Sequence, residues 1–190
     1  MIDKKNLENI AWVNRVRGGL LNIFIQVEHI MADITVRTKY GGDFALYYKN
    51  YKTAKNIVDD FISNYDNNST VLNKFFKDKQ SLESDLQKLV DIRNILAHFQ
   101  WYQNDSFLAT HPPQQEFFLL SCRKGQEECR SLVPQAISDY QKICSTLGAV
   151  LSQVQKEISL NLNVPLFSYP ADKIPESNQR IVVDKLTCLK

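Results

Sequence analysis

An arginine, an asparagine and a histidine stand close together near the middle of the chain, as Arg93, Asn94 and His98. If this stretch is helical, Asn94 and His98 lie on one side, and Asp91 joins them because it precedes His98 by seven residues. A carboxylate favours the charged form of a nearby histidine and an arginine opposes it, which suits a histidine for proton transfer near neutral pH. These residue types therefore fit a general acid or base.

A structural role fits the same residues. The stretch 89–102 is otherwise apolar enough to be buried, and buried charges must be paired because their desolvation is costly. In this alternative Asp91 pairs with a basic residue, His98 bonds a backbone carbonyl, and the network fixes how the helices pack. Arg93 lies about 140° around an ideal helix from His98, so it reaches the stripe only through its long side chain. The spacing alone does not decide between the two roles.

The composition fits one intracellular domain. At 190 residues the chain can bury a sizeable core, and its net charge of +2 neither requires nor excludes a nucleic-acid partner. Cys122, Cys129, Cys144 and Cys188 form no Cys-x-x-Cys pair and no cluster with histidine, so we expect reduced thiols, no metal site and no cofactor. The N-terminus lacks the pattern of a secretory signal, and the longest apolar run, residues 20–27, is too short to span a bilayer. We expect a cytoplasmic protein with no membrane contact.

Apolar residues recur at alternating three- and four-residue steps along most of the chain, which predicts amphipathic helices. Gly41-Gly42 is placed to end the first helix, and Pro134 is placed to begin the last. Between residues 105 and 132, a short apolar run followed by a turn favours a small β-hairpin insertion. The expected helices cover residues 6–37, 44–65, 70–77, 81–102 and 134–159.

The predicted fold class is all-α, as an antiparallel up-and-down bundle of four to five helices. The bundle fills residues 1–160 as one domain, and residues 161–190 form an irregular tail that packs on the bundle or on a partner. Arg17 interrupts the apolar stripe of the first helix, where it either extends its charged end to solvent or has a functional role. Gly18-Gly19 then allows a kink or the close approach of a neighbour.

The segment Arg93-Asn94-Ile95-Leu96-Ala97-His98 resembles the Arg-x4-6-His motif of HEPN domains (higher eukaryotes and prokaryotes nucleotide-binding), in which a polar residue, often asparagine, follows the arginine. Its place late in an inner helix of an all-helical domain, with one more long helix after it, also resembles that family. The toxin branch that pairs with nucleotidyltransferase antitoxins usually carries tyrosine two residues after the histidine, where this chain has Gln100. The resemblance covers residues 6–159 as architecture and residues 93–98 as sequence.

The resemblance implies a metal-independent endoribonuclease that acts as a homodimer on RNA, with the motifs of two subunits facing each other. His98 would take the proton from a ribose 2′-hydroxyl, Arg93 would stabilise charge on the phosphate, and Asn94 would orient the arginine or bind that phosphate. Asp91 lies outside the family motif, and helical spacing suggests that it holds the His98 ring. An antitoxin or regulatory protein would be a partner in a toxin–antitoxin or phage-defence system.

Two alternatives remain at this point. A HEPN-like domain can lack catalysis and serve as a nucleotide- or RNA-binding or protein-interaction module. The chain can also be a plain helical interaction protein in which the motif is accidental, and it would then be a monomer with His98 fully enclosed.

Overall fold

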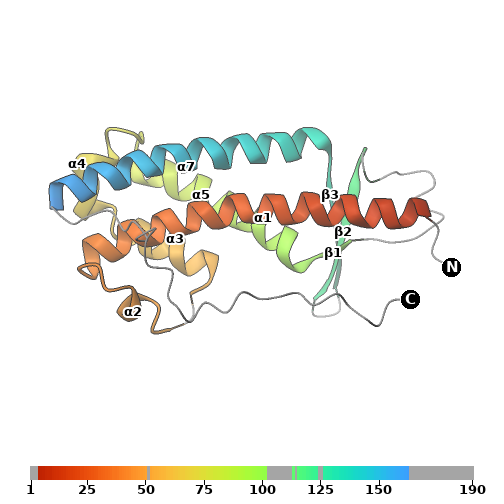
Figure 1. Cartoon of the computed structure of the whole chain (residues 1–190), viewed down its shortest axis with the longest axis horizontal. Coiled ribbons are helices and arrows are strands. Elements are labelled where there is room, and N and C mark those ends of the chain that lie inside the picture. Colours follow the sequence, from red (N-terminus) through yellow and green to blue (C-terminus); the bar gives the residue numbers. More distant parts are fainter. Residues whose placement is uncertain (1–3, 51, 102–112, 114, 124–125, 163–190) are drawn as a thin grey trace, which may run out of the picture.

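The computed structural model describes residues 4–50, 52–101, 113, 115–123 and 126–162, which are mostly helical and include one small antiparallel sheet (Figure 1). The prediction of a mainly helical protein is therefore confirmed. In chain order the elements are α1 (Lys4–Lys39), α2 (Phe44–Tyr47), α3 (Ala54–Ser63), the 3-10 turn η1 (Asp66–Asn68), α4 (Ser69–Leu72), α5 (Lys79–His98), β1 (Gln100–Trp101), β2 (Phe117–Arg123), β3 (Gln126–Leu132) and α7 (Pro134–Leu162).

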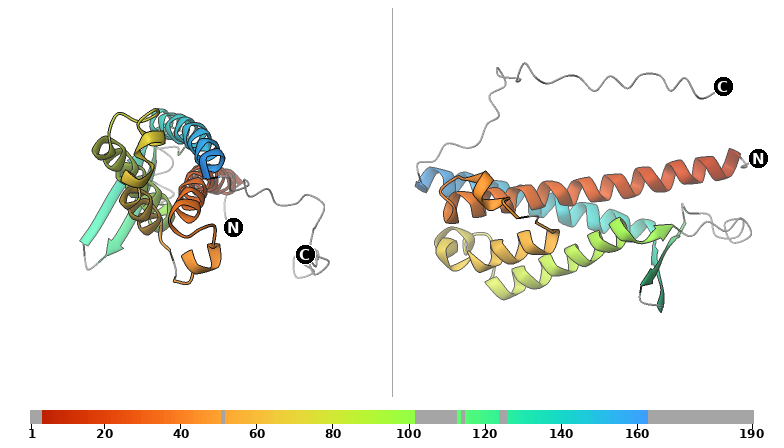
Figure 2. Two further views of the ribbon diagram at one scale, coloured as in Figure 1. Left: turned by 90° about the vertical axis from the view of Figure 1, so that its left-hand side faces the viewer. Right: turned by 90° about the horizontal axis from the view of Figure 1, so that it is seen from below.

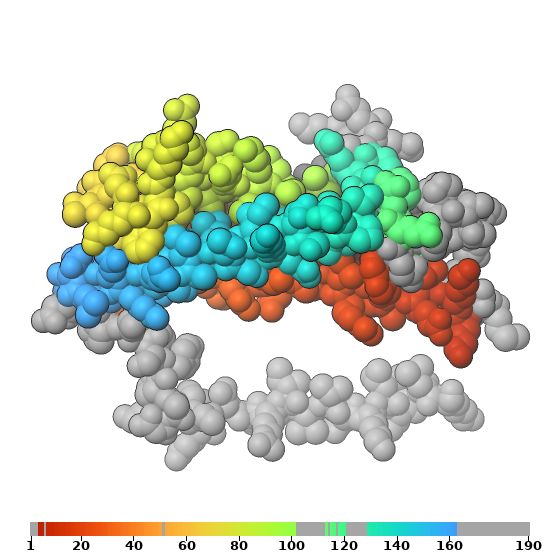
Figure 3. All heavy atoms as spheres, turned by 90° about the horizontal axis from the view of Figure 1, so that it is seen from above, coloured from red at the N-terminus to blue at the C-terminus, as the bar shows by residue number. Residues whose placement is uncertain are grey.

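The long helices α1 and α7 lie side by side and run in the same direction, while α5 runs the opposite way (Figure 1). Gln155 of α7 donates a hydrogen bond to Asp33 of α1, whereas Arg17 of α1 contacts the end of α5 and Glu28 contacts Arg93, further from that end. On the face shown in Figure 3, α7 lies between the α4–α5 region and α1. The three helices thus enclose one core.

The apolar stripes expected for the first and last helices form that core. Phe24 of α1 and Leu151 of α7 are both fully buried, and Leu96 brings α5 to the same core. The other members of the two stripes are buried or partly buried, namely Ile10, Val13, Leu20, Val27, Met31, Ile34, Ile137, Tyr140, Cys144, Leu147, Val154 and Ile158. Periodicity therefore identified the packed faces of both helices correctly.

The end of α1 follows the predicted glycine pair. Gly41 and Gly42 adopt φ values of +60° and +91°, and the amide of Gly42 bonds the carbonyl of Val36. No neighbour approaches the pair Gly18-Gly19 closely in the described part of the chain. α1 continues through both residues, and a Cβ added at either would meet nothing within 4 Å.

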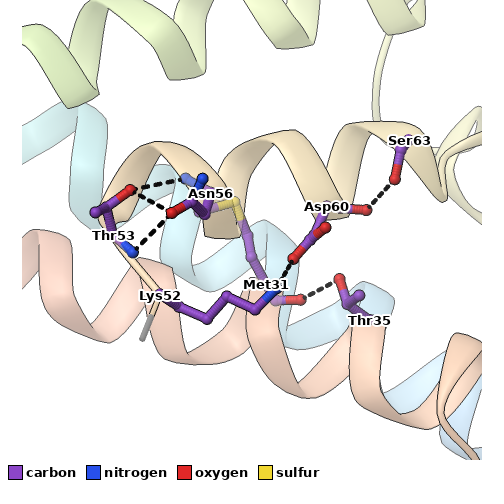
Figure 4. A network of polar contacts seen from close by, with 7 residues as sticks. All are labelled: Met31, Thr35, Lys52, Thr53, Asn56, Asp60 and Ser63. Atoms are coloured by element: carbon purple, nitrogen blue, oxygen red, sulfur yellow. Dashed lines mark hydrogen bonds and ion pairs between the residues drawn. The ribbon is translucent and has the colours of Figure 1, made fainter. Parts of the chain in front are cut away.

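The predicted helix over residues 44–65 is wrong, because the structure divides it into α2 and α3. Thr53 is extended and caps α3, where its hydroxyl accepts from the amide of Asn56 and the Asn56 side chain accepts from the amide of Thr53 (Figure 4). Asn64, just after α3, bonds Thr38 near the end of α1, so α3 runs in the same direction as α1. The expected up-and-down order is therefore interrupted between these two helices.

Two further helices have bounds that differ from the prediction. The short helix expected at residues 70–77 is the single turn α4, Ser69–Leu72. α5 begins at Lys79 with Asp78 as its cap, rather than at Ser81. It ends at His98 and does not continue to residue 102, because Gln100 and Trp101 pair with β2 as the strand β1. The amide of Ser81 donates to the Asp78 carboxylate at 2.7 Å, and this bond lowers the pKa of Asp78.

The predicted hairpin is present as β2 and β3, and β1 adds a third strand in the order β1-β2-β3. Trp101 pairs with Leu119, and Leu119 pairs with Arg130 on the other side. Leu119 is fully buried, so this face of the sheet packs toward the helices at the end of α5, while the hairpin extends away from them (Figure 2). The sheet therefore connects the end of α5 to the start of α7.

Helix α1 is long and apolar enough over Leu7–Lys39 to cross a membrane, by length and composition alone. In the structure 56% of its most apolar window is buried, and the core helix of a soluble protein passes the same test. The apolar run 20–27 is too short to span a bilayer by itself, but the helix that contains it is long enough. The cytoplasmic location stays a prediction. The proposed tail lies outside the described residues beyond Leu162, as does most of the connection between β1 and β2.

Candidate functional site

The residues of the motif lie in the last turns of α5, which ends at His98. His98 and Asp91 are exposed, whereas Arg93 and Asn94 are partly buried. The expectation that the whole stretch is buried is therefore wrong. α5 is amphipathic, and its apolar side alone faces the core, so the argument from the cost of buried charge applies to Arg93 and not to His98.

Arg93, Asn94 and His98 all line one open pocket of about 640 Å³. Phe99 follows His98 and Ile95 lies between the polar residues, so the pocket also has an apolar side. The start of α3 and one residue of β3 complete it through Thr53, Ala54, Lys55 and Arg130, and Asp91 lines it as well. The structure thus brings the motif together with residues that are distant in sequence.

Arg93 is held from behind by a buried carboxylate on α1. Its Nε lies 3.3 Å from Oε1 of Glu28, and the exposed fractions of the two side chains are 22% and 8%. Neither atom has a hydrogen-bond partner among the described residues, so each depends on this ion pair. Pairing through Nε leaves the terminal nitrogens of the guanidinium for the pocket, where Nη1 lies 3.4 Å from Oδ1 of Asn94. The arrangement can present a fixed cation to an anionic ligand.

Burial dominates the electrostatics behind Arg93. It raises the pKa of Glu28, against the opposing effect of Arg93 and a smaller one of His29. On α7, burial also raises the pKa of Tyr140 and raises that of Cys144 to about 11. Tyr140 and Cys144 therefore stay protonated at neutral pH, and Glu28 is the group whose charge balances Arg93.

Asp91 does not make the contact expected of it. Its Oδ1 accepts a hydrogen bond from Gln87 at 3.0 Å, one turn earlier on α5. Within the described part of the chain, no hydrogen bond or ion pair joins Asp91 to His98, although both line the pocket. Helical spacing placed the two side chains on the same surface but did not make them partners.

Arg17 caps the end of α5 that carries His98. Its Nε and Nη2 donate to the carbonyl of Leu96 at 3.0 and 2.6 Å, and Nη2 also donates to that of Phe99 at 3.0 Å. The last carbonyls of a helix lack partners within it, and a cation there also complements the helix dipole. Burial lowers the pKa of Arg17, but the group remains a cation. The residue thus has a positioning role rather than simply reaching to solvent.

Replacing Arg17 with methionine is expected to lower the free energy of unfolding by about 1–2 kcal/mol, because methionine keeps the apolar stem but leaves two partly buried carbonyls without this donor. Chemical denaturation would measure the change. Arg15→Met is the control, since Arg15 is exposed on the same helix and its replacement should change stability by less than about 0.5 kcal/mol. Equal effects at the two positions would show that the hydrogen bonds of Arg17 contribute nothing.

Comparison of the chain with protein-family models, curated proteins and solved structures finds no match. The geometry of the pocket therefore has to support any functional assignment. In the described residues, no group of three or more histidines, cysteines, aspartates and glutamates lies close enough to hold a metal ion. Cys129 and Cys144 are free thiols, one exposed and one buried.

Sequence reasoning missed three charged residues of this site. Glu28 is a charged residue within the first apolar helix, which indicates that it needs a partner of opposite charge. Nothing in the sequence identified Arg93 as that partner. Lys55 and Arg130 belong to elements whose positions follow only from the break before α3 and from the pairing of β3. A pocket that joins three separate elements cannot be read from the spacing within one of them.

Proposed function

We propose that this chain is a metal-independent endoribonuclease of the HEPN type, with its helices arranged as the bundle of that family. One observation supports the proposal most: the three motif residues line a single open pocket, and Arg93 is fixed there by a buried carboxylate. The metal-independent mechanism itself comes from the motif resemblance.

In the proposed reaction His98 takes the proton from the 2′-hydroxyl of the ribose next to the scissile phosphate. The 2′-oxygen forms a bond to phosphorus and the bond from phosphorus to the 5′-oxygen of the next nucleotide breaks, while that oxygen gains a proton. Arg93 stabilises the negative charge on the phosphate through its forked donors, and Asn94 orients Arg93 or binds the phosphate. The products are one strand with a 2′,3′-cyclic phosphate and one with a 5′-hydroxyl.

We also propose that the enzyme is a cytoplasmic homodimer in which the pockets of two subunits face each other across a cleft. An exposed His98 at the mouth of an open pocket is compatible with such a facing arrangement. An antitoxin or regulatory protein of a toxin–antitoxin or phage-defence system would then control access to this cleft. The support for these partners is the resemblance to the HEPN family.

A non-catalytic RNA-binding module is the second candidate. It is favoured by the surroundings of His98, because no hydrogen bond or ion pair in the described residues fixes its ring. A general base generally needs such an orienting partner. In the first proposal the substrate or the second subunit supplies it.

Cleavage of RNA in excess chelator tests the proposed activity. The purified protein is incubated with a labelled single-stranded RNA in EDTA, and the ends of the products are identified by mass spectrometry. We expect cleavage that persists in the chelator and gives 2′,3′-cyclic phosphate ends. The same strand with a 2′-deoxy sugar at each cleavage site should remain intact, since it lacks the nucleophile.

Cleavage of the deoxy strand, or 3′-hydroxyl product ends, would contradict the mechanism. Failure to cleave any RNA, in a preparation that still binds it, would favour the non-catalytic module.

A further inference from the structure

The pocket carries more positive charge than the motif alone supplies. Lys55 from α3 and Arg130 from β3 line it together with Arg93, so cations approach from three separate elements. Asp91 is the one carboxylate among the described residues of the lining, and Glu28 is buried behind Arg93. A pocket with this balance favours an anionic ligand that extends beyond a single phosphate.

Both additional cations are placed to act on a ligand. Lys55 is exposed and pairs with Asp59 one turn later at 2.9 Å, and exposed pairs of this kind are worth only about 0.3–0.5 kcal/mol, so a phosphate can replace that partner. Arg130 is exposed and lies directly across the sheet from buried Leu119. Paired residues of neighbouring strands share one face, so Arg130 is on the face that packs toward the helices.

The size and the apolar side of the pocket decide which form of nucleic acid fits. A volume of about 640 Å³ is that of a small-ligand pocket and can hold one or two nucleotides, but it cannot admit a double helix. Unpaired bases can enter such a pocket and contact its apolar side, which partly buried Ile95 and the edge of nearly buried Phe99 form here. In-line attack by a 2′-hydroxyl also needs a backbone free to leave the duplex geometry.

We propose that this pocket binds an unpaired segment of RNA, with Lys55 and Arg130 holding the phosphates next to the one held by Arg93. The inference rests on the proposed function for the identity of the ligand. Lys55 and Arg130 are binding residues in this proposal, and the chemistry stays with Arg93 and His98.

Binding of a strand that cannot be cleaved tests the inference separately from the activity. The probe is a fluorescein-labelled RNA of mixed sequence, 12 nucleotides long, with 2′-O-methyl groups at every position, and its affinity for the full chain is measured by fluorescence anisotropy. The same strand annealed to its complement serves as the duplex probe. We expect the single strand to bind at least tenfold more tightly than the duplex.

Lys55→Ala and Arg130→Ala should each weaken single-strand binding about three- to tenfold and reduce the slope of log affinity against log salt by about 0.7. Lys88→Ala is the matched control, because Lys88 is also an exposed lysine paired with a nearby aspartate, and it does not line this pocket. The control should bind like the unaltered protein.

Equal or tighter binding of the duplex would overturn the inference, as would equal affinities of the Lys55 and Lys88 variants. Absence of binding to either probe would overturn it too. A protein that binds the single strand as expected but cleaves no RNA would contradict the proposed enzyme and support the binding site. A protein that cleaves RNA, but whose Lys55 and Arg130 variants bind with unchanged affinity, would support the enzyme and contradict the binding site.

Discussion

Replacing His98 with alanine is expected to slow RNA cleavage by about 10²–10⁴-fold, the usual contribution of a positioned general base. His98 is exposed at the end of α5, so the free energy of unfolding should change by less than about 0.5 kcal/mol. Single-turnover rates measure the effect on the chemical step, and anisotropy with the 2′-O-methyl strand shows whether binding persists. A loss of rate without a loss of affinity is the signature of a catalytic residue.

His29→Ala is the matched control, because His29 is an exposed histidine on α1 and does not line the pocket. Its rate should stay within about twofold of the unaltered protein. Unchanged cleavage by the His98 variant would assign the reaction to another group or to a contaminating nuclease. Loss of binding together with rate would instead place His98 among the residues that hold the RNA.

The helices could be predicted from the sequence where a single apolar face dominates. Phe24 and Leu151 stand in stripes whose apolar members are all buried or partly buried, so α1 and α7 follow directly from periodicity. Thr53 shows where such reasoning fails. Apolar and aromatic residues on both sides of it recur at helical spacing, but the reciprocal bonds between Thr53 and Asn56 begin a new helix. The usual capping box has glutamate or glutamine at that position, so asparagine gave a weak signal.

In the site, too, features that depend on one helix could be predicted, whereas contacts between helices could not. The common surface of Asn94 and His98 could be predicted, because it depends only on the repeat of one helix. The partners of Arg93 and Arg17 could not, because each contact joins α1 to α5 and depends on how these helices pack. A charged residue within an apolar stripe shows that some partner exists, but its identity requires the tertiary structure.

The ion pair between Arg93 and Glu28 leads to the largest expected change in stability. Arg93→Met should lower the free energy of unfolding at pH 7 by about 2–3 kcal/mol, because it leaves the Glu28 carboxylate buried without its partner. Adding Glu28→Gln should restore most of that loss, since the amide carries no charge that must be desolvated. Glu28→Gln alone should have the smaller effect of the two single changes, because Arg93 remains partly exposed. Chemical denaturation of the four proteins completes this double-mutant cycle.

The pH dependence of the cycle identifies its cause. Burial raises the pKa of Glu28 and Arg93 opposes that rise, so removing Arg93 raises the pKa further. A carboxyl whose pKa is raised by folding destabilises the folded protein as the pH rises above the unfolded value, and this penalty disappears in acid. The decrease in the free energy of unfolding caused by Arg93→Met should therefore be smaller at pH 4 than at pH 7. In a protein that also carries Glu28→Gln, this decrease should not depend on pH. A loss that is the same at both pH values would mean that the stem of Arg93, rather than its charge, stabilises the fold. RNA cleavage should stay low in the double variant even where its stability is restored, because the cation proposed to stabilise the phosphate is gone.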